Sequence, residues 1–426
     1  MHQSLDETPY WQSFLPEGPL VPDMELPDRC DIAVIGGGFT GLSTAIHLAK
    51  AGADVAVFEQ GRLGSGASTR NGGQTLAGLK LSPAQLIKKY GLSKGRQFYE
   101  ASLDAIDYLE GFFEEEGIDC DFKRRGGLWA AFTPGHFEEL KGSQALLRET
   151  FDHETHLVEK SDLRSELGSD IYHGGLVDPI SGGLNSGKYV AGLVTTALKY
   201  EVRLYENTEI VGVTRADGGF RVSTKDNEMM AAQVAVATNA FTPGHLKGLL
   251  RRIIPIGSSI ITTEPLDEGL ARTLIPKGRM VFDTKKYLNY FRITEDNRML
   301  FGGRASLAEL SAQETAAVIR QSMVRVFPEL EKVRIERSSN CNVGFTFDQM
   351  PHIGMHEGLH YAMGFCGHGV ANGFYFGSRL ARLMQGKLQD FPFVDLKFPT
   401  IPFYREKAWF LPITGYAYQL KDKFAR

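Results

Sequence analysis

Apolar positions near the start of the chain predict a strand, a helix and a second strand in close succession. Residues 32–35 form a short apolar run bounded by glycines, which is typical of a buried parallel strand. Apolar residues then recur at helical spacing from Leu42 to Ala49, and Gly52 marks the end of the helix. The apolar run 55–58 predicts the second strand, so we expect one βαβ unit here.

The rest of the chain alternates between the same two kinds of pattern. Ser82, Pro83 and Gln85 have the spacing of a helix cap, first residue and third residue, and helical periodicity then continues to about Gly117. Over residues 171–185, glycines and a proline break any regular pattern. We expect further helices over 137–148, 186–200, 307–327 and 370–384, and further strands over 120–132, 202–205, 208–213, 233–237, 254–262, 287–293, 299–302 and 361–363.

Glycines follow the first strand with G-x-G-x-x-G spacing. Gly36 allows a tight turn, Gly38 lets backbone approach a pyrophosphate, and Gly41 lets the helix pack closely on the sheet. The free N–H groups at the start of that helix favour a phosphate. Glu59, at the end of the second strand, suits both hydroxyls of an adenosine ribose and would repel the 2′-phosphate of NADP. The pattern predicts a dinucleotide site, and an ordinary glycine-rich turn is the alternative.

The loop over residues 61–74 is rich in glycine, short hydroxyl side chains and arginine. Its backbone N–H groups suit a polar planar ligand, and a flexible surface loop is the alternative. Residues 1–30 are rich in proline and lack periodicity. We expect them to form an N-terminal arm over the first domain, anchored by burial of Tyr10 and Trp11; a floppy tail is the alternative.

Composition excludes several classes of protein. A net charge of −4 over 426 residues gives no basic field for nucleic acid. No apolar stretch reaches the length of about 18 residues that would span a bilayer. The N-terminus lacks the pattern of a signal peptide, and the four cysteines form no C-x-x-C pair. We therefore expect a cytoplasmic enzyme with reduced thiols. No cluster of His, Cys and Asp residues has the spacing of metal ligands, so we expect no metal.

The βαβ unit and the sequence GSGASTRNGG that follows it resemble the FAD-dependent amine and amino-acid oxidoreductases, which include D-amino acid oxidase, glycine oxidase and sarcosine oxidase. The resemblance extends along nearly the whole chain. It implies FAD rather than NAD and an α/β fold (α+β overall). In that fold, a Rossmann-like FAD-binding domain is assembled from discontinuous segments, beside a substrate domain with a large mixed β-sheet and helices.

The resemblance also implies a division of the chain. Residues 31–80, 186–245 and 335–390 would form the FAD-binding domain, and residues 81–185 and 246–334 would form the substrate domain. Residues 391–426 would pack on the body as a C-terminal segment.

Several short segments are expected to meet at FAD. In the family, backbone near Ile210 contacts the adenine, and a turn that usually reads A-T-G is replaced here by a turn ending in Asn239, which tolerates left-handed backbone. The turn before residue 370 would face the N1–C2=O edge of the flavin, assisted by His368; a helix cap packed away from the ring is the alternative. The expected FAD-binding residues are Gly36, Gly38, Phe39, Thr40, Gly41, Glu59, Gln60, Ser68, Thr69, Arg70, Asn71, Gly72, Gly73, Gln74, Ile210, Ala237, Thr238, Asn239, Gly364, Gly367, His368, Gly369 and Val370.

Candidates for substrate chemistry lie in YLNYFRI, residues 287–293. Strand alternation places Tyr290 and Arg292 on one face. Aromatic walls desolvate an amine and favour its neutral form, and Arg292 suits a carboxylate. Core packing and a strand-end salt bridge are the alternatives. With His368, these two residues are the predicted catalytic residues.

Two positions bear on the flavin and on the electron acceptor. Cys341 lies seven residues before Asp348, which is the spacing of the flavin-linked cysteine in monomeric sarcosine oxidase. We expect non-covalent FAD instead, with Cys341 as a small buried side chain. The oxygen-activating lysine of the same relatives corresponds to Leu300, so either another cation serves oxygen or the electrons pass to a different acceptor.

The resemblance predicts FAD-dependent oxidation of a C–N bond in a small-molecule amine or amino-acid-like substrate, with gamma-glutamylated amines as the leading class. Hydride would pass to flavin N5 and the imine would hydrolyse, with O2 or another electron acceptor completing the cycle. An NAD-dependent dehydrogenase and a flavin-binding redox module without an amine substrate are the alternatives.

Overall fold

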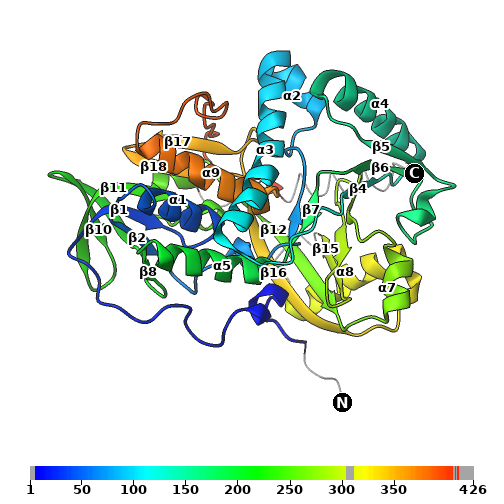
Figure 1. Cartoon of the computed structure of the whole chain (residues 1–426), viewed down its shortest axis with the longest axis horizontal. Helices are drawn as coiled ribbons and strands as arrows, with labels where there is room; N and C mark the ends of the chain where they lie inside the picture. Colours follow the sequence, from blue (N-terminus) through cyan, green and yellow to red (C-terminus); the bar gives the residue numbers. More distant parts are fainter. Residues whose placement is uncertain (1–4, 304–310, 406–407, 409, 412–426) are drawn as a thin grey trace.

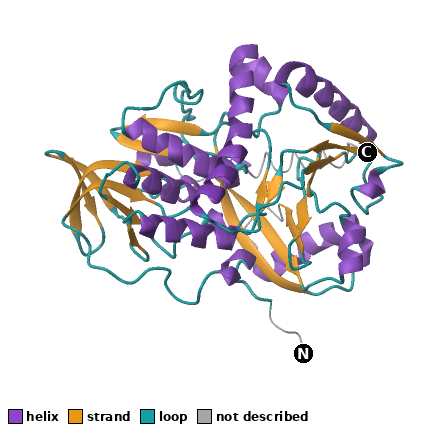
Figure 2. Ribbon diagram, viewed as in Figure 1, coloured by secondary structure: helices purple, strands orange, loops and turns teal. Residues whose placement is uncertain are grey.

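The computed structural model describes residues 5–303, 311–405, 408, 410 and 411. Most of its strands fall into two eight-stranded sheets, one at each end of an elongated molecule, with helices packed around and between them (Figures 1 and 2). The predicted class, a mixed α/β fold, is confirmed.

The first sheet joins strands from the beginning, the middle and the end of the chain. Its order is β17 (His352–His356), β18 (Leu359–Met363), β11 (Glu228–Val236), β1 (Arg29–Ile35), β2 (Val55–Phe58) and β8 (Arg203–Tyr205), and β10 (Gly219–Ser223) pairs with both β11 and β9 (Gly212–Ala216). Strand β1 is parallel to both β2 and β11. All of β2 and the last four residues of β1 are buried, as expected for strands covered on both faces.

Helices cover this sheet where the apolar periodicity predicts them. Helix α1 (Phe39–Ala49) lies between α5 (Ser186–Lys199) and α9 (Gly369–Met384), and α3 (Leu92–Glu116) packs against α9 (Figure 1). Helix α2 (Pro83–Tyr90) begins with the expected capping box between Ser82 and Gln85.

The second sheet is mixed, as expected. Its order is β16 (Ile335–Phe345), β12 (Ile254–Thr263), β15 (Met299–Gly303), β14 (Tyr290–Ile293), β13 (Met280–Asp283), β4 (Gly127–Ala130), β6 (Gly174–Asp178) and β5 (His156–Glu159). Its pairs are antiparallel except β13 with β4. Helix α8 (Ala312–Val326) packs against β12, β15 and β16.

The remaining elements are short or peripheral. They are α4 (Pro134–Phe151), α6 (Lys247–Leu250), α7 (Glu268–Leu274), the two-stranded pair β3 (Gln74–Thr75) and β7 (Gly182–Gly183), and the 3₁₀ turns η1 (Tyr10–Phe14), η2 (Ala67–Thr69), η3 (Leu163–Ser165), η4 (Asn239–Phe241) and η5 (Pro328–Leu330).

The helical pattern expected up to about Gly117 is divided into α2 and α3 at Gly91, and the strand expected over 208–213 begins only at Gly212. Three further details differ from the sequence-based expectations. Residues 174–178, within a stretch expected to be irregular, form the fully buried strand β6. Residues 335–345, assigned from the resemblance to the FAD-binding part, form an edge strand of the second sheet. The strand expected over 287–293 begins only at Tyr290, so Tyr287 lies in the preceding turn.

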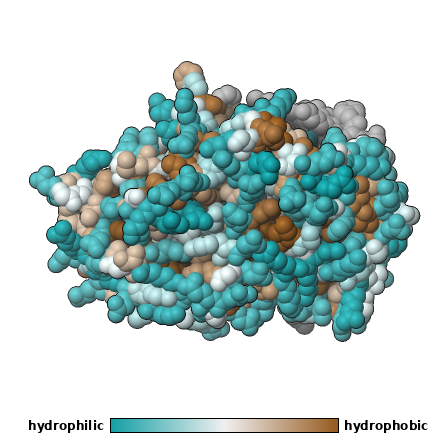
Figure 3. Space-filling model, turned by 45° about the horizontal axis from the view of Figure 1, so that its top comes forward, coloured by the Kyte–Doolittle hydropathy of each residue, from teal (hydrophilic) through white to brown (hydrophobic). Residues whose placement is uncertain are grey.

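Both ends of the described chain are held by burial. Tyr10 and Trp11 of the N-terminal arm are buried in a cluster with Ile260 and Leu300 of the second sheet. The expected burial of the two side chains is therefore confirmed. Near the other end, the Tyr404 hydroxyl donates to the Ile253 carbonyl at 2.6 Å. In the part of the chain that the structure describes, no helix is long and apolar enough to cross a membrane, and Figure 3 shows a largely hydrophilic face with scattered apolar groups.

Candidate active site

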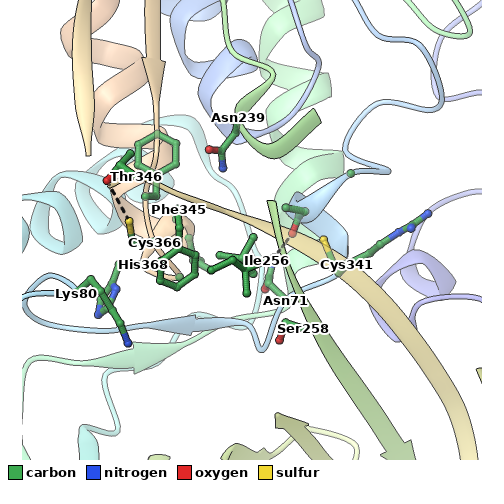
Figure 4. Close-up of a pocket in the computed structure, with 18 of the residues that line it drawn as sticks. Asn71, Lys80, Asn239, Ile256, Ser258, Cys341, Phe345, Thr346, Cys366 and His368 are labelled. Atoms are coloured by element: carbon green, nitrogen blue, oxygen red, sulfur yellow. Dashed lines mark hydrogen bonds between the residues drawn. The ribbon is translucent and has the colours of Figure 1, made fainter. Parts of the chain in front are cut away.

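A cavity of about 940 Å³ is lined by residues of both sheets and of the segments between them. Residues of the first βαβ unit, the loop 61–74 and the start of α9 line one part of it, and residues of β4, β13 and the following turn line another. This volume is in the range of cofactor and ligand pockets. The cavity is therefore the candidate active site, and Figure 4 shows part of its lining.

The glycine turn at the start of α1 has the geometry that the sequence predicts. Gly36 has φ +106°, a region that favours glycine, and a Cβ at Gly41 would overlap the Gly36 carbonyl oxygen. A Cβ at Gly38 would lie 2.8 Å from the Ser68 hydroxyl. Any larger residue would therefore fill the space at the helix start, where free N–H groups suit a phosphate.

Glu59 stands at the end of β2 and lines the cavity. Its carboxylate accepts hydrogen bonds from the backbone N–H groups of Gly37 at 2.8 Å and Gly61 at 3.1 Å. Burial raises the pKa of Glu59 above its ordinary value, the backbone hydrogen bonds oppose that rise, and the Glu206 carboxylate adds to it. A neutral partner such as a ribose diol fits this carboxylate, whereas a phosphate would add a further negative charge.

The loop 61–74 is folded against the start of α1. The Ser68 hydroxyl accepts a hydrogen bond from Phe39 N–H at 3.0 Å, and Asn71 Oδ1 accepts from Gly73 N–H at 2.7 Å. Trp11 of the N-terminal arm donates its indole N–H to the Asn71 carbonyl at 2.7 Å. Arg70 lines the cavity, and its buried Nε has no hydrogen-bond partner among the described residues. This donor fits an anionic or polar ligand in the cavity.

Asn239 holds the turn after β11 in the expected conformation. Its φ is +45°, the left-handed region that asparagine tolerates, and its Oδ1 accepts a hydrogen bond from Gly364 N–H at 2.9 Å. The asparagine therefore tolerates the left-handed backbone of this turn and also ties it to the turn after β18.

His368 is the residue immediately before α9 and lines the cavity. Burial, which disfavours the charged ring, and the Lys80 ammonium lower the pKa of His368 to about 4. The ring is therefore neutral at pH 7. Its buried Nδ1 has no partner among the described residues, so it can hydrogen-bond to a ligand.

Most of the predicted site residues come together in this cavity. Gly41, Thr69, Gly73, Gly364 and Arg292 do not line it. The predicted residues that do line it are Gly36, Gly38, Phe39, Thr40, Glu59, Gln60, Ser68, Arg70, Asn71, Gly72, Gln74, Ile210, Ala237, Thr238, Asn239, Tyr290, Gly367, His368, Gly369 and Val370.

Arg292 lies behind the cavity wall. The side chain is 2% exposed, and its Nη1 donates to the carbonyls of Gly73 at 2.8 Å and Leu184 at 3.0 Å. Burial lowers the pKa of Arg292 to about 10, which still leaves it charged at neutral pH. In this arrangement Arg292 supports the loop 61–74 and does not reach a carboxylate in the cavity.

Tyr290 keeps its predicted place on the cavity wall. Its hydroxyl lies 3.0 Å from Ser258 Oγ, and burial raises its pKa to about 12, so the phenol stays protonated at neutral pH. Cys341 also lines the cavity, near Ser258 and Asn71 in Figure 4. Burial raises the pKa of the Cys341 thiol to about 12, so the thiol is protonated rather than reactive at neutral pH.

A second set of lining residues was not found from the sequence. Trp129 and Phe282 pack with ring centroids 5.5 Å apart, and Lys285 Nζ lies 3.3 Å from the buried Asp283 carboxylate. These residues belong to strands or turns with no chemical motif, so only the alternation of β4 and β13 could have indicated them. The members of the set are Lys80, Tyr99, Trp129, Phe282, Asp283, Lys285, Lys286, Phe345 and Phe347. Tyr287, an aromatic candidate of the segment 287–293, lines the cavity as predicted.

Leu300 is fully buried with the arm residues Tyr10 and Trp11 and does not line the cavity. Among the residues with assigned positions, no group of three or more His, Cys, Asp or Glu side chains could hold a metal ion.

Comparison with known proteins decides the family. The profile of the family described as FAD dependent oxidoreductase matches residues 31–383, which is most of the chain. This chain belongs to that family. It is thus an FAD-dependent oxidoreductase, and the cradle around Gly38 and Glu59 is the part of its cavity that fits the adenine-linked end of the cofactor.

Its relatives cover nearly its whole length. The chain is 34% identical over 387 residues to a probable oxidoreductase OrdL of Haemophilus influenzae, with 89% of each chain covered. It is 32% identical over 400 residues to gamma-glutamylputrescine oxidoreductase of Escherichia coli, with 92% of this chain and 93% of the relative covered. The crystal structure of glycine oxidase from Geobacillus kaustophilus has the same fold, with a TM-score of 0.75 at 22% identity over 87% of this chain and 99% of that one.

Proposed function

We propose that this enzyme oxidises a C–N bond of a small amine, and that gamma-glutamylated amines are its substrate class. The observation that carries the proposal is that one cavity contains two kinds of lining. The glycine turn of α1 and Glu59 line one part, and aromatic side chains and lysines of β4, β13 and the following turn line the other. The relative named gamma-glutamylputrescine oxidoreductase supports the substrate class.

The first sheet and its helices would act as the FAD-binding domain and the second sheet as the substrate domain. Glu59 would hold the ribose, the start of α1 the pyrophosphate, and the turn Gly367–Gly369 the flavin edge. Bound FAD supplies the hydride acceptor for the carbon next to nitrogen.

The chain's own side chains would orient and desolvate the amine. Trp129, Phe282 and Tyr287 form aromatic walls that exclude water and favour the neutral amine. Tyr290 stays protonated and can donate a hydrogen bond from the wall. Since binding and orientation are the main contributions, no strong base is required.

A substrate carboxylate would be recognised by the turn after β13 rather than by Arg292. Lys285 and Lys286 both line the cavity there. We expect K286Q to raise the KM for a gamma-glutamylated amine by about tenfold, because a charge-assisted hydrogen bond is lost, and to leave the KM for a plain alkyl amine nearly unchanged. Steady-state kinetics with both substrates measure this difference, and an equal rise for both would contradict it.

Anaerobic mixing with a panel of amines tests the proposed reaction. The purified protein should be yellow, and its flavin absorption should bleach with gamma-glutamylated amines. A colourless protein that reduces NAD would instead favour a dehydrogenase, and a yellow protein that no amine bleaches would favour a redox module. Admitting air to the reduced protein and measuring peroxide then decides between O2 and another electron acceptor.

We also propose that FAD is bound without a covalent bond and that the enzyme acts in the cytoplasm. The protonated thiol of Cys341 and the four free, buried cysteines support these two points. Acid precipitation of the yellow protein should leave the flavin in the supernatant. Flavin that stays with the pellet in the wild type, and is released from C341S, would contradict this.

A further inference from the structure

Lys80 is a cavity residue to which neither the family fold nor the sequence motifs give a role. It lies in the segment between β3 and α2, and its side chain lines the cavity. Its Nζ is 6.0 Å from the centre of the Phe345 ring, and Figure 4 shows the side chain beside His368. The ammonium thus lies between Phe345 of the second sheet and His368 at the start of α9.

The charge of Lys80 acts on neighbouring titratable groups. Burial and then the Lys80 ammonium lower the pKa of His368, so a proton on that ring is disfavoured. The same ammonium opposes the burial that raises the pKa of the Cys366 thiol. Both effects have the same cause, because a cation disfavours a second positive charge nearby and favours a negative one.

A substrate amine in this cavity would experience the same field. Free alkyl amines are mostly protonated at pH 7, and an ammonium ion has no lone pair to assist loss of hydride from the adjacent carbon. A fixed cation nearby favours release of the extra proton to water when the amine binds. The amine nitrogen is then ready for oxidation, and no bond to Lys80 forms or breaks.

We propose that Lys80 is an electrostatic positioning residue that makes the site select the neutral form of the substrate amine. This inference rests on the proposed amine oxidation. The carboxylates around the cavity have other partners or lie in solvent: Asp348 accepts from His352 Nε2 at 3.0 Å, Asp283 pairs with Lys285 at 3.3 Å, Glu59 accepts from the N–H groups of Gly37 and Gly61, and Glu209 is exposed. The other cations that line the cavity are Arg70, Lys285 and Lys286. None of these carboxylates is therefore positioned to act as the counter-ion of a substrate ammonium.

The test compares K80Q with K80R in the FAD-loaded enzyme. The probe is tert-butylamine, which has no hydrogen on the carbon next to nitrogen, and its binding is followed by the change in the flavin spectrum. At pH 7, K80Q should bind this amine about tenfold more tightly than the wild type, because the ammonium form becomes tolerated. K80R keeps the charge and should behave as the wild type does.

Flavin reduction by an oxidisable amine should change in the opposite direction. In K80Q the bound amine holds its proton more strongly, so reduction at pH 7 should be about tenfold slower and should approach the wild-type rate at alkaline pH. Tighter binding with slower reduction is a combination that a loss of packing would not produce.

Two controls separate charge from structure. The alcohol tert-butanol has the same shape without a titratable nitrogen, so its affinity should be unchanged in K80Q. K89Q removes a lysine that contacts the Asp348 carbonyl at 2.9 Å and does not line the cavity, and it should change neither measurement. Equal weakening of amine and alcohol in K80Q, or a K80R enzyme that behaves as K80Q does, would overturn the proposal.

The binding measurement does not require turnover. A wild-type enzyme that shows the expected binding pattern but is bleached by no amine would contradict the proposed oxidation and support the role of Lys80. If amines bleach the flavin but the expected binding pattern is absent, the proposed oxidation is supported and the role of Lys80 is contradicted.

Discussion

At the scale of single residues, Asn239 combines two properties, of which glycine lacks one and alanine lacks both. It adopts φ +45° and accepts a hydrogen bond from Gly364 N–H. We expect N239A to lower the free energy of unfolding by about 2 kcal/mol, because alanine is strained there and leaves the Gly364 donor unpaired. N239G keeps the conformation and should lose only about 1 kcal/mol. Denaturant unfolding measures both, and equal losses would show that backbone strain contributes nothing.

Glu59 provides a second prediction at this scale. E59Q removes the negative charge that would face the ribose in the proposed site, and we expect the Kd for FAD to rise about tenfold, as for the loss of a hydrogen bond to a charged group. Titration of the apoprotein with FAD, followed by flavin fluorescence, gives the Kd. E115Q, which alters an exposed partner of Lys50, is the matched control. An unchanged Kd in E59Q would show that Glu59 does not contribute to FAD binding.

Single residues also show how far the sequence can be interpreted. The turn at Gly36 was predicted because the chemistry of a turn is local, and the turn at Asn239 was located through the family resemblance. Arg292 was placed on the correct strand, but its partners, the carbonyls of Gly73 and Leu184, are more than one hundred residues away along the chain. Lys80 follows no motif, and only folding brings it to His368. Long-range proximity of this kind cannot be derived from spacing.

At the scale of elements, the contact between α1 and β1 depends on Gly41. A Cβ there would overlap the Gly36 carbonyl oxygen, so we expect G41A to lower the free energy of unfolding by about 3 kcal/mol and to abolish tight FAD binding. Gly111 in α3 is the control, since a Cβ there meets nothing within 4 Å. G111A should stabilise the protein by about 0.5–1 kcal/mol. Thermal unfolding compares the two, and a stable, FAD-binding G41A would contradict the close packing.

The elements that were wrongly predicted share one cause. Strand β6 begins with two glycines, and glycine lowers strand propensity; its pairing with β4 and β5 overrides this. Strand β16 precedes β17 closely in sequence but pairs with β12, about eighty residues away. Helices with a clear apolar face, such as α1 and α9, were predicted closely because their signal is contained in their own sequence.

At the scale of the whole molecule, Trp11 connects the N-terminal arm to both halves. Its indole donates to Asn71, and its ring lies 6.0 Å from the Arg292 guanidinium. W11A should lower the free energy of unfolding by about 3–5 kcal/mol and weaken FAD retention, because a buried aromatic side chain is removed beside the loop 61–74. W11F keeps much of the apolar volume and should lose less. Unfolding curves and flavin release on dilution test this, and a stable W11A would mean that the arm is dispensable.

The order of strands in the first sheet has a consequence for the timing of biosynthesis. The ribosome delivers β1, α1 and β2 first, whereas their neighbour β11 ends at Val236 and the turn Gly367–Gly369, which also lines the cavity, arrives much later. Domains form as their segments emerge, at about 5–20 residues per second. A growing chain therefore contains the glycine turn at the start of α1 long before it contains all the residues of the cofactor pocket. Uptake of FAD becomes a late event, and truncated products end their synthesis colourless.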